Sequence, residues 1–215
     1  MRLNFLDSMT DTPKFRRQIP EERKKEMVEA TLRCLGQKGS EGLSVRNISA
    51  EAGISIGLIN HHYPSKDDLV AAAYEKLATD LLHYVVQLVE QSGGTPRERM
   101  SAFFRGYFSS EILDQKILRV WVVFWNMSEK SEKVRQSHDR TYAGFRAQLE
   151  QMLCDLVNHP GIPDFNHRLA AIGLSAMLDG LWLEWCLNPA TFAPEEGLRI
   201  CEAWVDGLVS GAFDL

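Results

Sequence analysis

Apolar side chains recur at three- and four-residue steps almost without pause from residue 21 onward, which is the period of an α-helix. The first such run contains Met27, Ala30, Thr31, Cys34 and Leu35. Glycines and prolines divide the pattern into segments, and one run is ambiguous, because VWVVFW at 120–125 is rich in strand-forming residues. Its position among helices favours a helix. The sequence therefore predicts an all-α fold.

Glycine, proline and capping residues predict where the helices begin and end. Gly53 is expected to take a positive φ at the end of a short helix, and Ser65 with Asp68 forms a capping box that opens a long helix. This long helix is expected to connect a small domain to a larger one. The expected helices run from 21 to the glycines at 39 and 42, and then over about 45–52, 55–63, 65–91, 96–112, 115–129, 131–158, 165–187 and 194–211.

Charge is distributed unevenly along the chain. Residues 1–66 hold 11 Lys and Arg against 8 Asp and Glu, whereas the remaining residues hold 13 against 21. A basic N-terminal third suits a module that faces phosphates. We expect a flexible arm at 1–20, a small helical domain at 21–66 and a larger domain at 67–215. The basic cluster Lys14, Arg16 and Arg17 is either part of a disordered tail or an arm that enters a DNA minor groove.

The four cysteines occur singly inside helical patterns, without a CxxC pair: Cys34, Cys154, Cys186 and Cys201. A chain of 215 residues can build a core without disulfides. We therefore interpret all four as buried, reduced thiols. The first twenty residues contain no apolar run of signal-peptide length, so we expect the chain in the cytoplasm.

The segment 43–66, LSVRNISAEAGISIGLINHHYPSK, contains two short helices joined by AGIS. Its apolar residues are spaced to pack against the preceding helix, which is the arrangement of a helix-turn-helix. Ser44 and Arg46 lie at the start of the first helix, where backbone N–H groups favour an anion. The exposed face of the second helix is expected to contain Ser55, Ile56, Gly57, Leu58, Asn60 and His61. In a helix-turn-helix, side chains of the second helix contact base edges, and contacts to phosphates position the protein along the DNA.

This segment resembles the DNA-binding signature of the TetR family of transcriptional regulators, including its aromatic-Pro-x-Lys end and the long helix that follows at once. The resemblance covers about residues 20–80. It implies phosphate or base contacts by Ser44, Arg46, Ser55, Gly57, Asn60, His61, His62 and Lys66. Asn60 and His62 stand where the family more often has tyrosine, so their division between phosphate and base contacts stays open. Tyr63 replaces the usual phenylalanine and is expected to fill the core.

His61 and His62 also raise the question of a metal site. Adjacent residues on a helix point about 100° apart and do not easily ligate one ion. We therefore expect neither a metal nor a cofactor.

The run 169–187, LAAIGLSAMLDGLWLEWCL, is apolar nearly all round and nominally long enough to cross a bilayer. Asp179 and Glu184 inside it would be costly in lipid. We expect instead a helix buried on two sides, against its own core and against a partner subunit, and no membrane partner. The TetR resemblance implies that the last two helices of each subunit form a four-helix homodimer interface, here with Trp204, Val205 and Leu208.

Four of the five tryptophans lie within 117–127 and 169–187. With the runs LRVWVVFW and LDGLWL, these segments resemble the branch of the family that includes the choline-sensing betaine-pathway repressors. Because ring faces attract ammonium ions, we expect a small organic cation as effector, such as choline, another quaternary ammonium or a polyamine. Asp179 shares a helix face with Ser175 and Trp182 and is the expected counter-ion. The expected walls are Phe104, Tyr107, Trp121, Phe124, Trp125, Trp182 and Trp185.

Two alternatives to this effector site remain open. The rings are plain core, or Asp179 caps or pairs within the dimer interface. The corresponding alternative for the ligand is an effector that is hydrophobic and either neutral or acidic.

No pattern typical of an enzyme occurs in the sequence: it contains no GxSxG, HExxH, P-loop or GxGxxG motif. The sequence thus predicts a dimeric, ligand-responsive repressor of a double-stranded DNA operator. The rival interpretation is a helical dimeric interaction protein that does not bind DNA.

Overall fold

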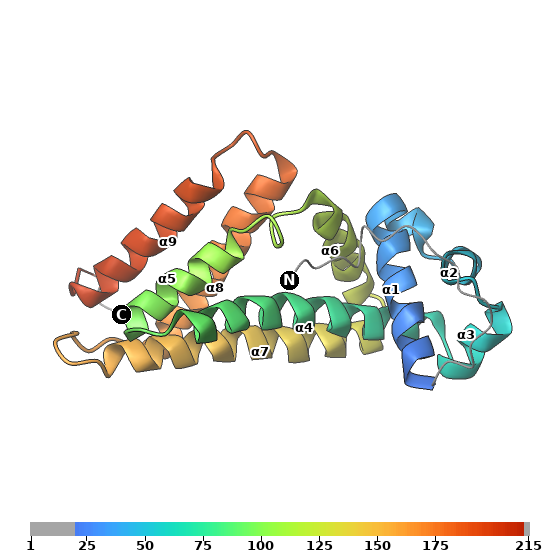
Figure 1. Ribbon diagram of the computed structural model, residues 1–215, viewed down its shortest axis with the longest axis horizontal. Helices are drawn as coiled ribbons and strands as arrows, with labels where there is room; N and C mark the ends of the chain where they lie inside the picture. Colours follow the sequence, from blue (N-terminus) through green and yellow to red (C-terminus); the bar gives the residue numbers. More distant parts are fainter. Residues whose placement is uncertain (1–19, 213–215) are drawn as a thin grey trace. The chain divides into compact units, whose positions relative to one another are not determined.

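The structure is a computed structural model that describes residues 20–212, and the expected arm with its basic cluster lies outside them. Within these residues it contains nine α-helices, one short 3₁₀ helix and no strand (Figure 1), which confirms the all-α prediction. The elements are α1 (Pro20–Lys38), η2 (Gly39–Gly42), α2 (Val45–Ala52), α3 (Ile56–His62), α4 (Lys66–Ser92), α5 (Pro96–Tyr107), α6 (Gln115–Ser128), α7 (Glu132–Val157), α8 (His167–Leu187) and α9 (Pro194–Val209).

The chain packs as two compact units. Unit 1 holds the residues up to Asp80 together with Lys116–Arg140, and unit 2 holds Leu81–Gln115 together with the residues from Thr141 onward. The first half of α4, nearly all of α6 and the start of α7 thus pack with the helices of the expected small domain. The ambiguous run at 120–125 is helical in α6, as predicted.

The N-terminal part of unit 1 is built on α1, whose inward side chains Met27, Ala30 and Leu35 are completely buried. The guanidinium of Arg33 is also buried and pairs with two carboxylates, 3.0 Å from Glu26 and 2.7 Å from Glu51 on α2. Burial alone would lower the pKa of Arg33, but the two hydrogen-bonded carboxylates outweigh it and raise that pKa. An unpaired buried cation is costly, so this pair fixes α2 against α1.

The rest of unit 1 packs around Tyr74 of α4, which is 2% exposed. Its ring meets Trp121 edge-on at 5.0 Å and Phe124 at 4.8 Å between centroids. Its hydroxyl lies 2.7 Å from Nδ1 of His138 on α7. At the start of α4, the Ser65 and Asp68 capping box forms as predicted, with each backbone N–H bonded to the other side chain.

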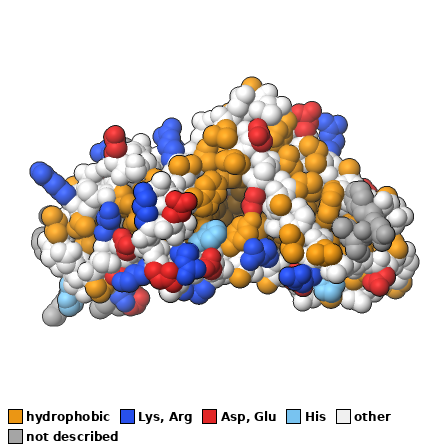
Figure 2. Space-filling model, turned by 180° about the vertical axis from the view of Figure 1, so that it is seen from behind, with side chains coloured by type: hydrophobic (Ala, Val, Ile, Leu, Met, Phe, Trp, Pro, Cys, Tyr) orange, Lys and Arg blue, Asp and Glu red, His pale blue; other side chains and the backbone are white. Residues whose placement is uncertain are grey.

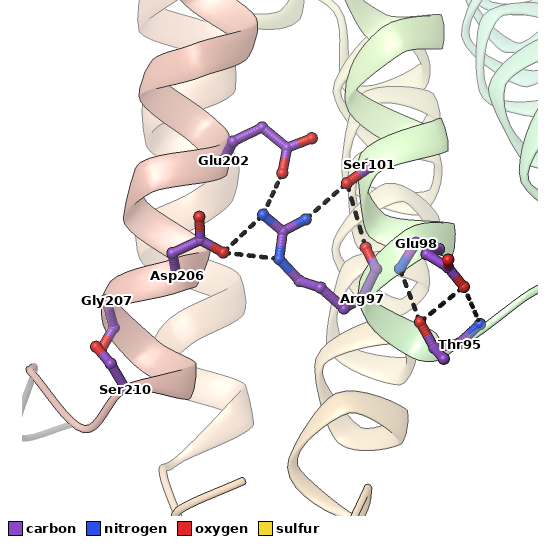
Figure 3. A network of polar contacts seen from close by, with 8 residues as sticks. All are labelled: Thr95, Arg97, Glu98, Ser101, Glu202, Asp206, Gly207 and Ser210. Carbon is purple, nitrogen blue, oxygen red and sulfur yellow. Dashed lines mark hydrogen bonds and ion pairs between the residues drawn. The ribbon is translucent and has the colours of Figure 1, made fainter.

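In unit 2, Arg97 of α5 joins that helix to α9 (Figure 3). Its Nε and Nη2 donate to the Asp206 carboxylate at 2.9 and 2.7 Å, it pairs with Glu202, and its Nη1 donates to Ser101 at 2.6 Å. Burial would lower the pKa of Arg97, yet these carboxylates raise it overall. The charges of Glu202 and Asp206 on α9 are thereby compensated within the unit.

Helix α8 provides much of the core of unit 2, with Leu174 and Leu178 fully buried. The indole of Trp182 donates to the carbonyl of Ile112 at 3.1 Å. Among the described helices, α8 is the one whose length and apolar composition match a membrane span. Its inward face packs inside unit 2, as a core helix does.

Three of the four cysteine thiols are buried, but Cys154 keeps part of its surface exposed. It lies in the last turns of α7, beside the Asn158 side chain, where the helix approaches its exposed end. The expectation of burial is therefore wrong for this residue. Desolvation raises the pKa of both Cys186 and Cys201 to about 12, so these thiols stay protonated near neutral pH.

Candidate DNA interface and effector site

Helices α2 and α3 are joined by a turn whose geometry is fixed locally. Gly53 ends α2 in the left-handed conformation at φ 63°, as predicted. The Ser49 hydroxyl reaches across the turn and donates to the Ile54 carbonyl at 2.5 Å. These two features set the direction in which the chain enters α3.

Helix α3 is anchored by one fully buried side chain, Ile59, while Ile48 buries the inner face of α2. The rest of α3 faces outward. Gly57, Asn60 and His61 are exposed, as is Ile56 at 45%, while Leu58 and His62 are half-buried. A Cβ added at Gly57 would meet nothing closer than the Ser55 hydroxyl at 4.0 Å, so this part of the helix can approach a large partner closely.

Ser44 and Ser55 are the N-caps of the two helices. The Ser44 Oγ accepts from the Asn47 backbone at 3.1 Å, and the Ser55 Oγ accepts from the Leu58 backbone at 3.2 Å. Capping uses the oxygen lone pairs and leaves each O–H proton available for a phosphate. Arg46 and Lys66 are exposed nearby in the sequence, at the starts of α2 and α4. These two cations and two hydroxyls are of the type that binds a nucleic-acid backbone.

Tyr63 ends α3 and is half-buried rather than fully enclosed. Desolvation raises its pKa. Its ring therefore fills the core only in part.

The aromatic residues expected to line the effector site divide between the two units. Trp121, Phe124 and Trp125 belong to unit 1. Phe124 is fully buried against Tyr74, whereas Trp125 is 39% exposed and stacks on Trp121 at 6.4 Å. Phe124 therefore has no free face for a ligand.

Phe104, Tyr107, Asp179, Trp182 and Trp185 belong to unit 2. Phe104 is completely buried and Trp182 is 6% exposed, so both are structural parts of the core. Trp185 and Tyr107 are half-buried.

Four rings of unit 2 contact one another, and we call them the aromatic cluster: Phe103, Tyr107, Tyr142 and Phe145. Asp179 of α8 lies beside this cluster through Tyr142. Tyr142 of α7 donates its hydroxyl to the Asp179 carboxylate. Phe145 lies 6.2 Å from both Tyr142 and Tyr107, and Phe103 stacks on Tyr107 at 6.2 Å. Desolvation, followed by the charge of Asp179, raises the pKa of Tyr107 well above its ordinary value. A half-buried carboxylate and aromatic rings thus lie together in unit 2.

A cation already occupies one ring of the cluster. The guanidinium carbon of Arg146 lies 4.8 Å from the centroid of Tyr142, one helical turn along α7. Phe103, Tyr142, Phe145 and Arg146 are not among the residues expected from the sequence. The spacing of Phe103 with Tyr107 and of Tyr142 with Phe145 places each pair on one helix face, but tryptophan content alone does not point to them.

Hydrophobic side chains gather in patches between scattered charges on the face drawn in Figure 2. In unit 2, α8 leaves apolar and small residues exposed at helical spacing, with Leu169 at 45% and Ile172 at 46%. We call this the outer α8 stripe, and it comprises Leu169, Ile172, Gly173, Ala176, Gly180 and Leu187. Trp204 of α9 adjoins it, because a Cβ at Gly173 would lie 3.4 Å from the indole.

Of the three residues expected at a dimer interface, only Trp204 keeps an exposed part. Val205 and Leu208 are 0% and 1% exposed and belong to the chain's own core. They therefore have almost no surface left to offer a partner.

Two family descriptions match the chain. Residues 27–73 match bacterial regulatory proteins of the tetR family, and residues 96–210 match the C-terminal domain of BetI-type transcriptional repressors. An HTH-type transcriptional regulator BetI from Stenotrophomonas maltophilia is 30% identical over 188 residues, which cover 86% of this chain and 91% of that protein.

Solved structures agree in fold. A transcriptional regulator from Pseudomonas aeruginosa PAO1 is 49% identical with a TM-score of 0.84, covering 91% of this chain and 94% of that one. A regulator from Saccharomonospora viridis, solved in complex with choline, is 21% identical with a TM-score of 0.72, covering 86% and 96%.

Replacing Arg46 or Lys66 by Ala should weaken binding to all DNA sequences alike, because each substitution removes an exposed cation that is expected to contact a phosphate. The slope of log K against log salt should flatten by about 0.9 for each phosphate that is no longer neutralised. Asn60→Ala should instead change the sequence preference, because its amide faces outward from α3. Fluorescence anisotropy at several salt concentrations measures both effects.

Arg199→Ala, an exposed cation on α9, serves as the control and should leave the salt slope unchanged. An unchanged slope in the Arg46 and Lys66 variants would show that α2 and α4 do not contact phosphate.

Proposed function

The chain belongs to the TetR family and carries the C-terminal domain of a BetI-type transcriptional repressor, and we propose that it binds a palindromic operator as a homodimer and leaves it when a small organic cation binds in unit 2. Its role is that of a transcriptional repressor rather than an enzyme. The observation that carries the effector proposal is the Asp179 carboxylate among the rings of the aromatic cluster. We expect the protein to act in the cytoplasm.

Operator recognition is assigned to α2, α3 and the start of α4. The base-reading residues are proposed to be Gly57, Asn60 and His61, which are exposed on α3, together with the half-buried Leu58. Ser44, Arg46, Ser55, His62 and Lys66 are proposed to hold the phosphates. A twofold dimer presents two copies of α3 in opposite directions, which suits inverted half-sites.

A cationic effector is supported by charge and by ring chemistry. A carboxylate in a poorly hydrated site favours a positive partner, and ring faces hold ammonium groups at about 0.5 to 2 kcal/mol each. The position of Arg146 over Tyr142 illustrates that this face accepts a cation. The choline carried by the Saccharomonospora viridis regulator agrees with this chemistry. The effector walls are therefore proposed around Asp179, Tyr107 and Tyr142, with Trp185 as a neighbour on α8.

Homodimerisation is assigned to the outer α8 stripe and to Trp204 with Ile200 on α9. Leaving such a surface in water costs roughly 25 cal/mol per Å² of apolar area. Glycine and alanine in the stripe allow a second α8 to approach closely. A second copy of the chain therefore matches both its shape and its chemistry.

Ile172→Glu should dissociate the dimer, because it places a charge in the centre of the proposed apolar interface. Sedimentation equilibrium should show a dimer for the wild type at micromolar concentration and a monomer for the variant. Val122→Glu, at an equally exposed apolar site on α6, should leave the dimer intact. A wild type that sediments as a monomer would contradict the assignment.

Choline, betaine aldehyde, putrescine and spermidine should be titrated calorimetrically to identify the effector. Asp179→Asn keeps an acceptor for Tyr142 but removes the charge, so it should weaken cation binding about tenfold or more. Glu184→Gln, at an exposed acid on the same helix, is the matched control and should bind like the wild type. Binding of neutral or acidic apolar compounds, with no cation bound below millimolar concentration, would overturn the cationic effector.

A further inference from the structure

Two tyrosine hydroxyls of the aromatic cluster differ in their bonding. The hydroxyl of Tyr142 donates to Asp179. The hydroxyl of Tyr107 forms no hydrogen bond with any side chain or backbone group in the part of the chain that the structure describes. The protein itself therefore satisfies the hydroxyl of Tyr142 and not that of Tyr107, which leaves the Tyr107 hydroxyl available to another group.

The surroundings of Tyr107 are apolar on most sides. Phe103 stacks on its ring with an interplanar angle of 17°, Phe108 meets it at 5.7 Å, and Phe145 lies at 6.2 Å. Tyr107 nevertheless keeps part of its surface accessible, so its hydroxyl is not sealed inside the core. The ring is thus held rigidly while its polar end stays available.

Tyr107 also lies close to the proposed cation site. Phe145 contacts both Tyr107 and Tyr142, and Asp179 is the acidic charge that acts most strongly on the Tyr107 phenol. A ligand whose ammonium group binds at Asp179 would extend its other end among these rings. The Tyr107 hydroxyl, which has no hydrogen-bond partner among the described residues, is one polar group of this cluster that such a ligand can meet.

Building on the proposed cationic effector, we propose that Tyr107 is a specificity-determining residue whose hydroxyl hydrogen-bonds a polar group on the effector. The effector class is then an ammonium compound that also carries a hydroxyl or carbonyl oxygen. Cations that carry only alkyl groups gain the attraction of the Asp179 charge but no hydrogen bond from the Tyr107 hydroxyl, so they bind less tightly.

Choline and n-propyltrimethylammonium are a matched pair of probes, because they have the same shape and differ by a hydroxyl in place of a methyl group. The wild type should bind choline about three- to tenfold more tightly, as expected for one net hydrogen bond. Tyr107→Phe should bind both with equal affinity, at the level of the wild type with n-propyltrimethylammonium. Calorimetric titration of both proteins measures the four affinities.

A second measurement needs no ligand. Tyr107→Phe removes a hydroxyl without a protein partner, so its unfolding midpoint should be equal to or above that of the wild type. Tyr74→Phe removes a buried hydroxyl that is bonded to His138 and should lower the midpoint.

The outcomes of these two measurements distinguish a failure of the Tyr107 role from a failure of the proposed cation site. A choline preference that survives in Tyr107→Phe, or a clearly lowered midpoint in that variant, overturns the role of Tyr107 and leaves the cationic effector standing. If the wild type binds neither probe, the proposed cation site fails and the role of Tyr107 falls with it. Loss of the preference with an unchanged midpoint supports the proposal.

Discussion

The DNA-facing surface depends on the way α1 holds α2 and α3. Helix α3 has seven residues and a single fully buried side chain, Ile59, so it has little stability of its own. Its position is set by Ile48 on α2, by the turn at Gly53 and by the buried Arg33, which binds Glu51 from α1. Outward side chains on α3 are therefore presented on a rigid support, although almost none of α3 itself is buried.

The charged side chains of unit 2 lie in two different environments. Arg97 compensates Glu202 and Asp206 between α5 and α9, which stabilises the packing of these two helices. Asp179 lies among rings, and the Tyr142 hydroxyl that binds it is a neutral donor. A neutral donor does not cancel the charge of the carboxylate, which is the basis of the cationic effector that we propose.

Local patterns in the sequence predicted most of the fold. Gly53 and the Ser65 and Asp68 capping box define helix ends through interactions within four residues, and the structure reproduces them. The end of α5 was missed, because it stops at Tyr107 rather than near 112. The carbonyl of Ile112 instead accepts from Trp182, seventy residues away in the chain. No local pattern encodes that contact.

The proposed effector site likewise combines residues that local spacing indicates with residues that only tertiary packing brings together. Asp179 was proposed from its helical spacing to Ser175 and Trp182, whereas Tyr142 and Arg146 come from α7, whose register against α8 depends on tertiary packing. Val205 and Leu208 were expected at a dimer interface because the TetR resemblance implies one at the apolar faces of the last two helices. The apolar character of a helix face does not show whether the chain's own core or a partner subunit covers it. Here the chain's own core covers both residues.

The central claim is that one protein binds both operator and cation, and that each weakens the other. Binding linkage requires the two effects to be equal. The affinity for choline should be measured by calorimetry with and without saturating operator DNA, and the operator affinity with and without saturating choline. We predict that both affinities fall by the same factor, about a hundredfold for a coupling of roughly 2.7 kcal/mol. A factor of one in both directions would contradict the account, because the cation would then bind without releasing the DNA.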